Sequence, residues 1–146
     1  MLFRSDGTAS IEAGRIIYKQ TADTDKYFGG TTDIGGSGAL VFDISTTISQ
    51  DLSLKGTGDF IKTGTGTLTV SGALDAFKGA AEIQAGKLIY NKNEAADSYF
   101  GGSTLISPGT SLEFNIADSL IEAINGGITG ASGTNLTKTG DRKSVV

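Results

Sequence analysis

The sequence predicts an all-β protein made of short strands joined by tight corners, and three observations support this prediction. Between Gly56 and Tyr90, apolar and polar residues alternate with a period of two, as around Leu68 and Val70, which is typical of strands with one buried face. The 22 glycines of the 146 residues recur between these runs, where a corner needs a backbone that glycine adopts freely. The pattern also repeats along the chain. These observations alone leave a β-sandwich or a solenoid open.

The repeat is an internal duplication. Residues 11–44 align without a gap on residues 83–116, with 15 identities in 34 pairs, so one unit follows the other at an offset of 72 residues. We expect copies at about 9–80 and 81–140, the second incomplete. The clearest strands are residues 40–44 and 112–116, where Leu, Phe and Ile occupy alternate positions.

The central run, GTGDFIKTGTGTLTVSG followed by AEIQAGKLIY, resembles the autotransporter-associated β-strand repeat, found in the passenger regions of Gram-negative autotransporters (type V secretion). The residues that match, in the family's order, are Gly56, Gly58, Phe60, Lys62, Gly64, Gly66, Leu68, Val70, Gly72, Ile83, Ala85, Gly86 and Leu88. The resemblance implies a right-handed parallel β-helix, with about six coils over residues 1–140. Ile83 and Leu112 are expected to face its axis, and the threonines at 63, 65, 67 and 69 its outside.

The resemblance also implies a function: a stalk or adhesin segment of a protein on the bacterial surface or secreted from the cell. In that family a membrane β-barrel follows the passenger, so one is expected outside this segment. The sequence leaves two alternatives open. One is the scaffold of a carbohydrate-active β-helix enzyme, and the other is a repeat segment of a surface adhesin that is not an autotransporter.

Composition narrows the chemistry. The chain has no histidine and no cysteine, which removes the commonest general base and excludes disulfides and thiolate chemistry. A net charge of −4 with scattered basic residues argues against binding nucleic acid or an anionic membrane. No apolar run reaches the roughly 20 residues of a membrane-spanning helix. We expect no catalytic residues, no cofactor and no metal in this segment.

Several segments carry their own expectations. Polar loops are expected at residues 19–26 and 91–98, on one side of the rod, as possible contacts with a host surface or with another copy. The YFGG motif after each loop reads as the return into the coil. Residues 117–124 have the composition of one or two helical turns. The last six residues, 141–146, break the repeat pattern and are interpreted as a non-native tail.

Carboxylates are the first candidate site, because β-helix enzymes use grouped aspartates. Asp23 and Asp25 are close in sequence, but only Asp97 recurs in the second copy, and Asp43 is replaced there by Asn115. Surface solvation or turn capping is therefore the favoured interpretation, and glycosidase chemistry, which needs a defined cleft, is not.

Two further features have both a functional and a structural interpretation. GGSGALVFD, residues 35–43, has a weak likeness to glycine-rich calcium-binding repeats but does not recur every nine residues. An aromatic platform for a sugar or a partner is the functional interpretation of the aromatic pairs Tyr27–Phe28 and Tyr99–Phe100. Burial beneath the loops is favoured for these pairs.

Overall fold

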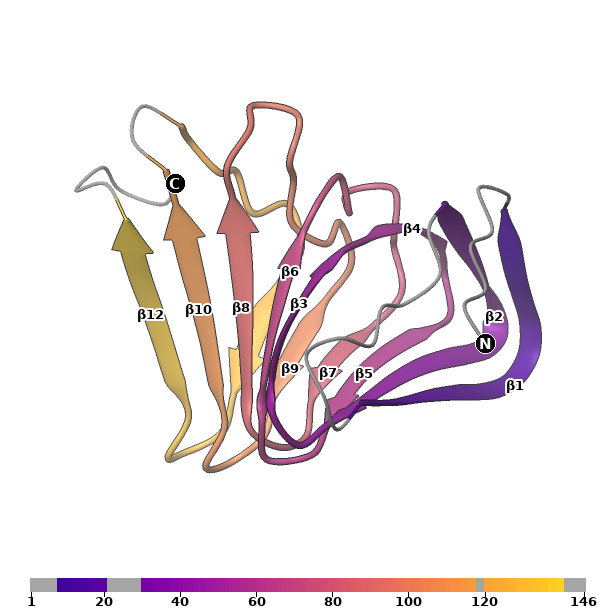
Figure 1. Cartoon of the computed structure of the whole chain (residues 1–146), viewed down its shortest axis with the longest axis horizontal. Helices are drawn as coiled ribbons and strands as arrows, with labels where there is room; N and C mark the ends of the chain where they lie inside the picture. Colours follow the sequence, from indigo (N-terminus) through magenta and orange to yellow (C-terminus); the bar gives the residue numbers. More distant parts are fainter. Residues whose placement is uncertain (1–7, 21–29, 118–119, 141–146) are drawn as a thin grey trace.

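The structure, a computed structural model, describes residues 8–20, 30–117 and 120–140, and it confirms an all-β fold of stacked parallel strands (Figure 1). The described strands are β1 (Ala9–Gln20), β2 (Thr31–Ile44), β3 (Thr47–Asp51), β4 (Ser53–Gly56), β5 (Asp59–Thr63), β6 (Thr67–Ser71), β7 (Ala81–Ile83), β8 (Lys87–Lys92), β9 (Thr104–Ile106), β10 (Ser111–Ile116), β11 (Ile128–Gly130) and β12 (Asn135–Gly140).

The strands form two sheets, which wind together as a solenoid. Sheet A has the order β1-β2-β5-β7-β9-β11, with β4 also paired to β2, and sheet B has the order β12-β10-β8-β6-β3. Every named pair is parallel, for example β6 with β8 and β8 with β10. In Figure 1 the chain advances from the indigo end at β1 to the yellow end at β12 as the turns stack.

The described solenoid has about five turns rather than the expected six. Successive turns place Leu40 beside Phe60, Phe60 beside Ala81, and Ala81 beside Thr104, so each takes a little over 20 residues. The first turn, from Ile11 to its partner Ile34, has a similar length, although β1 and β2 are 12 and 14 residues long and lie in sheet A throughout.

A third side of the solenoid consists of irregular segments that link the sheets. Neighbouring turns still bond there: Leu74 N donates to Ser98 O, and Ser98 N donates to Gly72 O. Isolated parallel bridges join Gly56 to Phe77 and Ala73 to Ser98. Since these segments make few ladder bonds, their inward side chains contribute much of the stability of this side.

The core is the shared interior of the stacked turns. Ile83 and Leu112 are fully buried (0%), which confirms their expected orientation toward the axis, and each buried side chain of this size contributes about 1.5–3 kcal/mol. Aromatic rings run through the interior from one end to the other: Phe42 contacts Phe60 at 5.6 Å between ring centroids, Phe60 contacts Phe100 at 5.0 Å, and Tyr99 contacts Phe114 at 4.8 Å.

Tight stacking of the corners explains why glycine is needed in them. A Cβ at Gly79 would lie 1.7 Å from the carbonyl oxygen of Gly58 in the turn before. A Cβ at Gly102 would lie 2.0 Å from the carbonyl oxygen of Gly79. The glycines of neighbouring corners therefore pack directly against one another, and the second glycine of the YFGG motif makes the expected return into the coil.

Two sequence expectations need correction. Residues 120–124 are not helical: Leu120 and Ile124 pack on the core and Glu122 is buried, whereas Ile121 is 64% exposed. This alternation has the period of an extended chain rather than of a helix. The polar loop of the second copy also begins later than expected, since β8 continues to Lys92 with that side chain turned inward. Among the described residues, no helix has the length and apolarity to cross a membrane.

Candidate functional site

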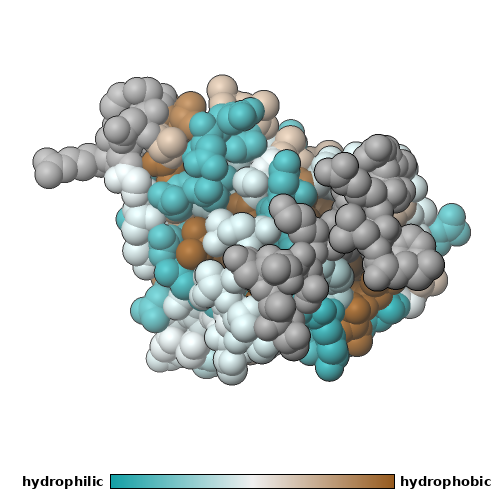
Figure 2. Space-filling view, in the orientation of Figure 1, coloured by the Kyte–Doolittle hydropathy of each residue, from teal (hydrophilic) through white to brown (hydrophobic). Residues whose placement is uncertain are grey.

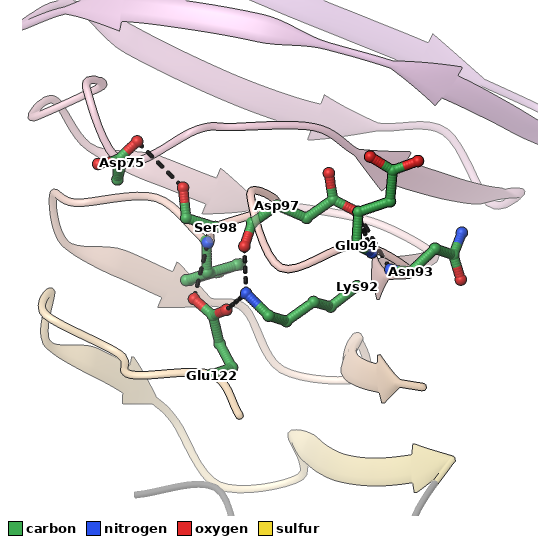
Figure 3. Close-up of polar contacts among 8 residues, drawn as sticks. Asp75, Lys92, Asn93, Glu94, Asp97, Ser98 and Glu122 are labelled. Carbon is green, nitrogen blue, oxygen red and sulfur yellow. Dashed lines mark hydrogen bonds and ion pairs between the residues drawn. The ribbon is translucent and has the colours of Figure 1, made fainter. Parts of the chain in front are cut away.

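A buried polar network lies on the third side of the solenoid and is centred on the ion pair of Lys92 and Glu122 (Figure 3). Lys92 lies at the end of β8, and its Nζ is 2.9 Å from Glu122 Oε2. Their side chains are only 6% and 3% exposed. A charge removed from water this completely is costly unless it is paired, so each of the two residues requires the other.

The remaining contacts of this network hold the loop at residues 93–98. Glu122 Oε1 accepts a 2.8 Å hydrogen bond from the backbone N–H of Tyr99, and Lys92 Nζ donates to the carbonyl oxygen of Asp97. Asp97 Oδ2 accepts from the N–H groups of Asn93 and Glu94, both at 3.1 Å. The loop is therefore closed by its own aspartate and fastened from below by the ion pair.

The structure of the second-copy loop can be compared with the roles expected for its residues. Asp97 caps a turn, which confirms the favoured interpretation of this residue. Tyr99 and Phe100 are buried, at 3% and 0% exposed, which confirms burial beneath the loop. Asp23, Asp25, Tyr27 and Phe28 lie outside the described residues, as do most of the loop at 19–26 and the tail at 141–146.

The tyrosines beside the ion pair are strongly desolvated. Tyr99 Oη is 2.8 Å from Thr104 Oγ1, and burial raises the pKa of Tyr99 well above its usual value although this hydrogen bond opposes the shift. Burial also raises the pKa of Tyr90, and the negative charges of Glu122, Asp97 and Asp75 add to the effect. Both tyrosines are neutral at physiological pH and act as core side chains.

Lys62 is a second buried cation, and it binds the corner that follows its own strand. Its Nζ donates to the carbonyl oxygens of Thr63 (2.6 Å), Gly64 (2.8 Å) and Ala85 (3.1 Å), so it joins two successive corners. The residue is 0% exposed, and burial lowers its pKa to about 8 against the opposing charge of Asp43.

The expectations from the sequence do not include Lys62, Lys92 and Glu122 as buried groups. A signal existed for Lys62, which follows the core residue Phe60 at a spacing of two and so shares its face. The helical interpretation of residues 117–124 concealed the equivalent signal for Glu122.

The outer face of sheet B is a regular polar surface, and we call it the polar face. It consists of the outward residues of β3, β6, β8, β10 and β12: Thr47, Ser49, Asp51, Thr67, Thr69, Ser71, Lys87, Ile89, Asn91, Ser111, Glu113, Asn115, Asn135, Thr137 and Thr139. Hydroxyl and amide groups dominate it, and neighbouring rows lie roughly 4.8 Å apart.

Specific contacts join the rows of the polar face. Lys87 Nζ is 2.5 Å from Glu113 Oε2, and Thr139 Oγ1 donates to Glu113 Oε1 at 2.7 Å. These hydrogen bonds, that from Lys87 first, lower the pKa of Glu113. Asn115 Nδ2 donates to Asn91 Oδ1 at 2.8 Å. The charges on this face are therefore largely paired within it.

The other candidates show no converging chemistry. Residues 35–43 lie within the extended strand β2, and Asp43 pairs with Lys19 at 3.3 Å. Among the described residues, no group of three or more acidic side chains is placed to hold a metal ion. A shallow groove of about 350 Å³ borders Thr31, Asp51 and Ser53. Figure 2 shows a face of mixed polarity, with hydrophobic areas small and separated.

Comparison with known proteins gives one informative relative. The chain is 32% identical over 127 residues to the adhesin BmaC autotransporter of Brucella suis biovar 1 (strain 1330). The match covers 84% of this chain but 4% of that protein, so the chain corresponds to a small part of it. No family model matches the chain, and no solved structure matches it. The adhesin similarity over 84% of the chain and the parallel β-solenoid together fit a repeat fragment of an autotransporter passenger domain.

Proposed function

We propose that this chain is a structural and adhesive segment of a passenger exposed on the bacterial surface or secreted from the cell, and that it acts by display and contact rather than by catalysis. The observation that carries the proposal is the uninterrupted parallel stacking of sheet B from β3 to β12, combined with similarity to a protein named as an adhesin. Such a solenoid lengthens by adding turns, since each turn contacts only its neighbours.

The disposition of charged groups supports a role without catalysis. Lys62 is held by backbone carbonyls, and Lys92 and Glu122 hold each other in the interior. On the outside, Lys87 and Glu113 form a pair, as do Lys19 and Asp43. All of these contacts join parts of the solenoid to one another.

The polar face supports weak, repeated contacts. Its rows of hydroxyl and amide groups present donors and acceptors at a fixed spacing, so a flat partner with matching groups can engage many of them at once. Individually weak contacts gain strength when several form together. The fixed loop at residues 93–98 is a second proposed contact surface, with its counterpart at residues 19–26 of the first copy.

Coated beads test the adhesive role. Beads carrying the full chain are expected to clump and to adhere to epithelial cell layers, as counted by flow cytometry and microscopy. Thr67→Glu with Thr69→Glu places charges in the β6 row of the polar face and should reduce adherence several-fold. Thr65→Glu is the matched control, since Thr65 is an exposed corner residue outside that face. Absence of adherence, or equal adherence of all three proteins, would contradict the adhesive role.

A further inference from the structure

Asn125 has a chemical setting that the other asparagines of the chain lack. Of the asparagines at 91, 93, 115, 125 and 135, it alone is followed by glycine. Glycine has no side chain to shield its backbone nitrogen, and it permits backbone conformations that other residues resist. The nitrogen of Gly126 can therefore approach the side-chain carbonyl carbon of Asn125 with little steric hindrance.

The structure leaves this dipeptide accessible. Asn125 is exposed and lies between β10 and β11, in a stretch without regular secondary structure. Within the described parts of the chain, neither the Asn125 amide nor the Gly126 N–H takes part in a hydrogen bond. By contrast, Asn115 lies in β10 and is bonded to Asn91.

The fold also fixes the glycine. A Cβ at position 126 would lie 1.7 Å from the carbonyl oxygen of Gly102 in the preceding turn, and such a contact cannot form without moving the backbone. The close stacking of corners thus retains the reactive partner of Asn125, and the sequence cannot remove it there without disturbing the turn.

We propose that Asn125 is a site of spontaneous deamidation in the folded protein. The nitrogen of Gly126 attacks Cγ of Asn125, a carbon–nitrogen bond closes a five-membered succinimide, and ammonia leaves with the proton from the Gly126 amide. Water then opens the ring at one of its two carbonyl carbons. Opening at the side-chain carbonyl gives aspartate, and opening at the main-chain carbonyl gives isoaspartate. The net change exchanges an amide and water for a carboxylic acid and ammonia, with no oxidation or reduction.

Isoaspartate at this position is expected to weaken the adjoining turn. It routes the main chain through the former side chain and so inserts an extra backbone atom immediately before the Gly126–Gly102 contact. The insertion lies three residues after Glu122, whose carboxylate pairs with Lys92 and accepts from Tyr99. The modification therefore acts as an age-dependent lesion next to the buried network.

Incubation of the folded full chain at mildly alkaline pH, followed by peptide mass mapping, tests the proposal. The peptide with Asn125 should gain one dalton several-fold faster than that with Asn93, which is also in a loop but precedes Glu94. An isoaspartate-specific methyltransferase should label the wild type and not Asn125→Gln, whose longer side chain disfavours the ring. The same chain unfolded in urea sets the rate without structure. The proposal would be overturned if Asn125 stayed unmodified in the folded protein, with a deamidation rate far below that of the chain in urea.

Unfolding temperatures separate the effect of the new charge at position 125 from the effect of the altered backbone. Aged wild-type protein should unfold at a lower temperature than fresh protein. Asn125→Asp carries the new charge on a normal backbone and should unfold close to fresh wild type. If aged protein is modified but unfolds at the same temperature as fresh protein, the expected link to the buried network is contradicted.

Discussion

The two copies of the duplication keep the same contacts in different places. In the first copy the ladder of β1, β2 and β5 lies in sheet A, whereas its counterpart in the second copy, β8, β10 and β12, lies in sheet B. Residues 9–20 form one strand, but their equivalents at 81–92 divide into β7 and β8 in different sheets. Similar sequences thus fix which strands are neighbours but not which side of the solenoid they occupy.

The corners decide the side. Ser107, Pro108, Gly109 and Thr110 close a turn in the second copy, with Thr110 N donating to Ser107 O and Gly109 at a φ of 77°. Proline followed by a residue of positive φ suits such a turn. The first copy has Gly35, Gly36, Ser37 and Gly38 at these positions, and β2 continues through them as one strand, with a shift of register against β1.

The two copies have contacting side-chain pairs at the same positions, but the charged pair and the neutral pair change places between the inside and the outside. Inside the first copy, Gln50 Nε2 donates to Gln20 Oε1 at 3.2 Å, and 72 residues later the same positions hold the ion pair of Lys92 and Glu122. Outside, the first copy has the ion pair Lys19–Asp43, and the second has the amide pair Asn91–Asn115. Each copy therefore contains one charged and one neutral pair, in opposite locations.

The largest expected effect concerns a position that the copies bury differently. Phe60 is 0% exposed, whereas its counterpart Leu136, in the edge strand β12, is 59% exposed. Phe60→Ala should lower the free energy of unfolding by about 3–5 kcal/mol through lost burial and a cavity. Leu136→Ala should cost less than about 1 kcal/mol. Urea titration measures both, and similar losses would contradict the described end of the stack.

The second prediction concerns the exchanged inner pairs. Glu122→Gln leaves the charge of Lys92 buried without its partner and should cost about 3–5 kcal/mol. Adding Lys92→Gln recreates the neutral pair of the first copy, and the double variant should recover much of that loss. Urea unfolding of the two single variants and the double variant gives the coupling energy. Purely additive losses would show that a pair of glutamines does not replace the ion pair at these positions.

The third prediction uses pH. The pKa of Lys62 is lowered to about 8 in the folded protein from about 10.4 in the unfolded chain. In this interval the unfolded chain binds more protons, so the free energy of unfolding should rise from about pH 8 to pH 10. Lys62→Met should abolish the rise.

Above about pH 10 the slope should reverse. The pKa values of Tyr90 and Tyr99 are raised by folding, so these groups lose their protons first in the unfolded chain. Tyr99→Phe should reduce the fall at high pH without altering the rise below it. A flat profile over the whole range would remove the claim that these groups are desolvated.

The smallest effect is expected on the outside. Lys19 is 72% exposed at its side chain, and its pair with Asp43 is open to solvent. Lys19→Ala should therefore cost less than about 1 kcal/mol, and salt should diminish this cost. Urea titrations at low and high salt measure it, with Asn91→Ala as the matched variant in the second copy.

Sequence reasoning found the strands because local alternation determines them. Leu40, Phe42 and Ile44 are all buried, and so are Leu112, Phe114 and Ile116, as their period of two requires. It did not find that the ladder of β1, β2 and β5 and its counterpart of β8, β10 and β12 lie in different sheets, because both ladders have the same neighbours and differ only at the corners. It also allowed one or two helical turns at residues 117–124, whereas residues 120–124 are not helical and Glu122 pairs with Lys92.

Disulfide trapping tests the central claim, that the second-copy ladder is stacked in sheet B on β6, most directly. In the structure Thr69 lies beside Ile89 in adjacent parallel strands, which are roughly 4.8 Å apart, within the range that a disulfide spans. The chain contains no cysteine, so Thr69→Cys with Ile89→Cys gives an unambiguous readout by mass after mild oxidation. We predict rapid, intramolecular bonding in this variant and none for Ile61→Cys with Ile89→Cys. The reverse result would place β8 on β5 in sheet A instead of on β6 and contradict the account.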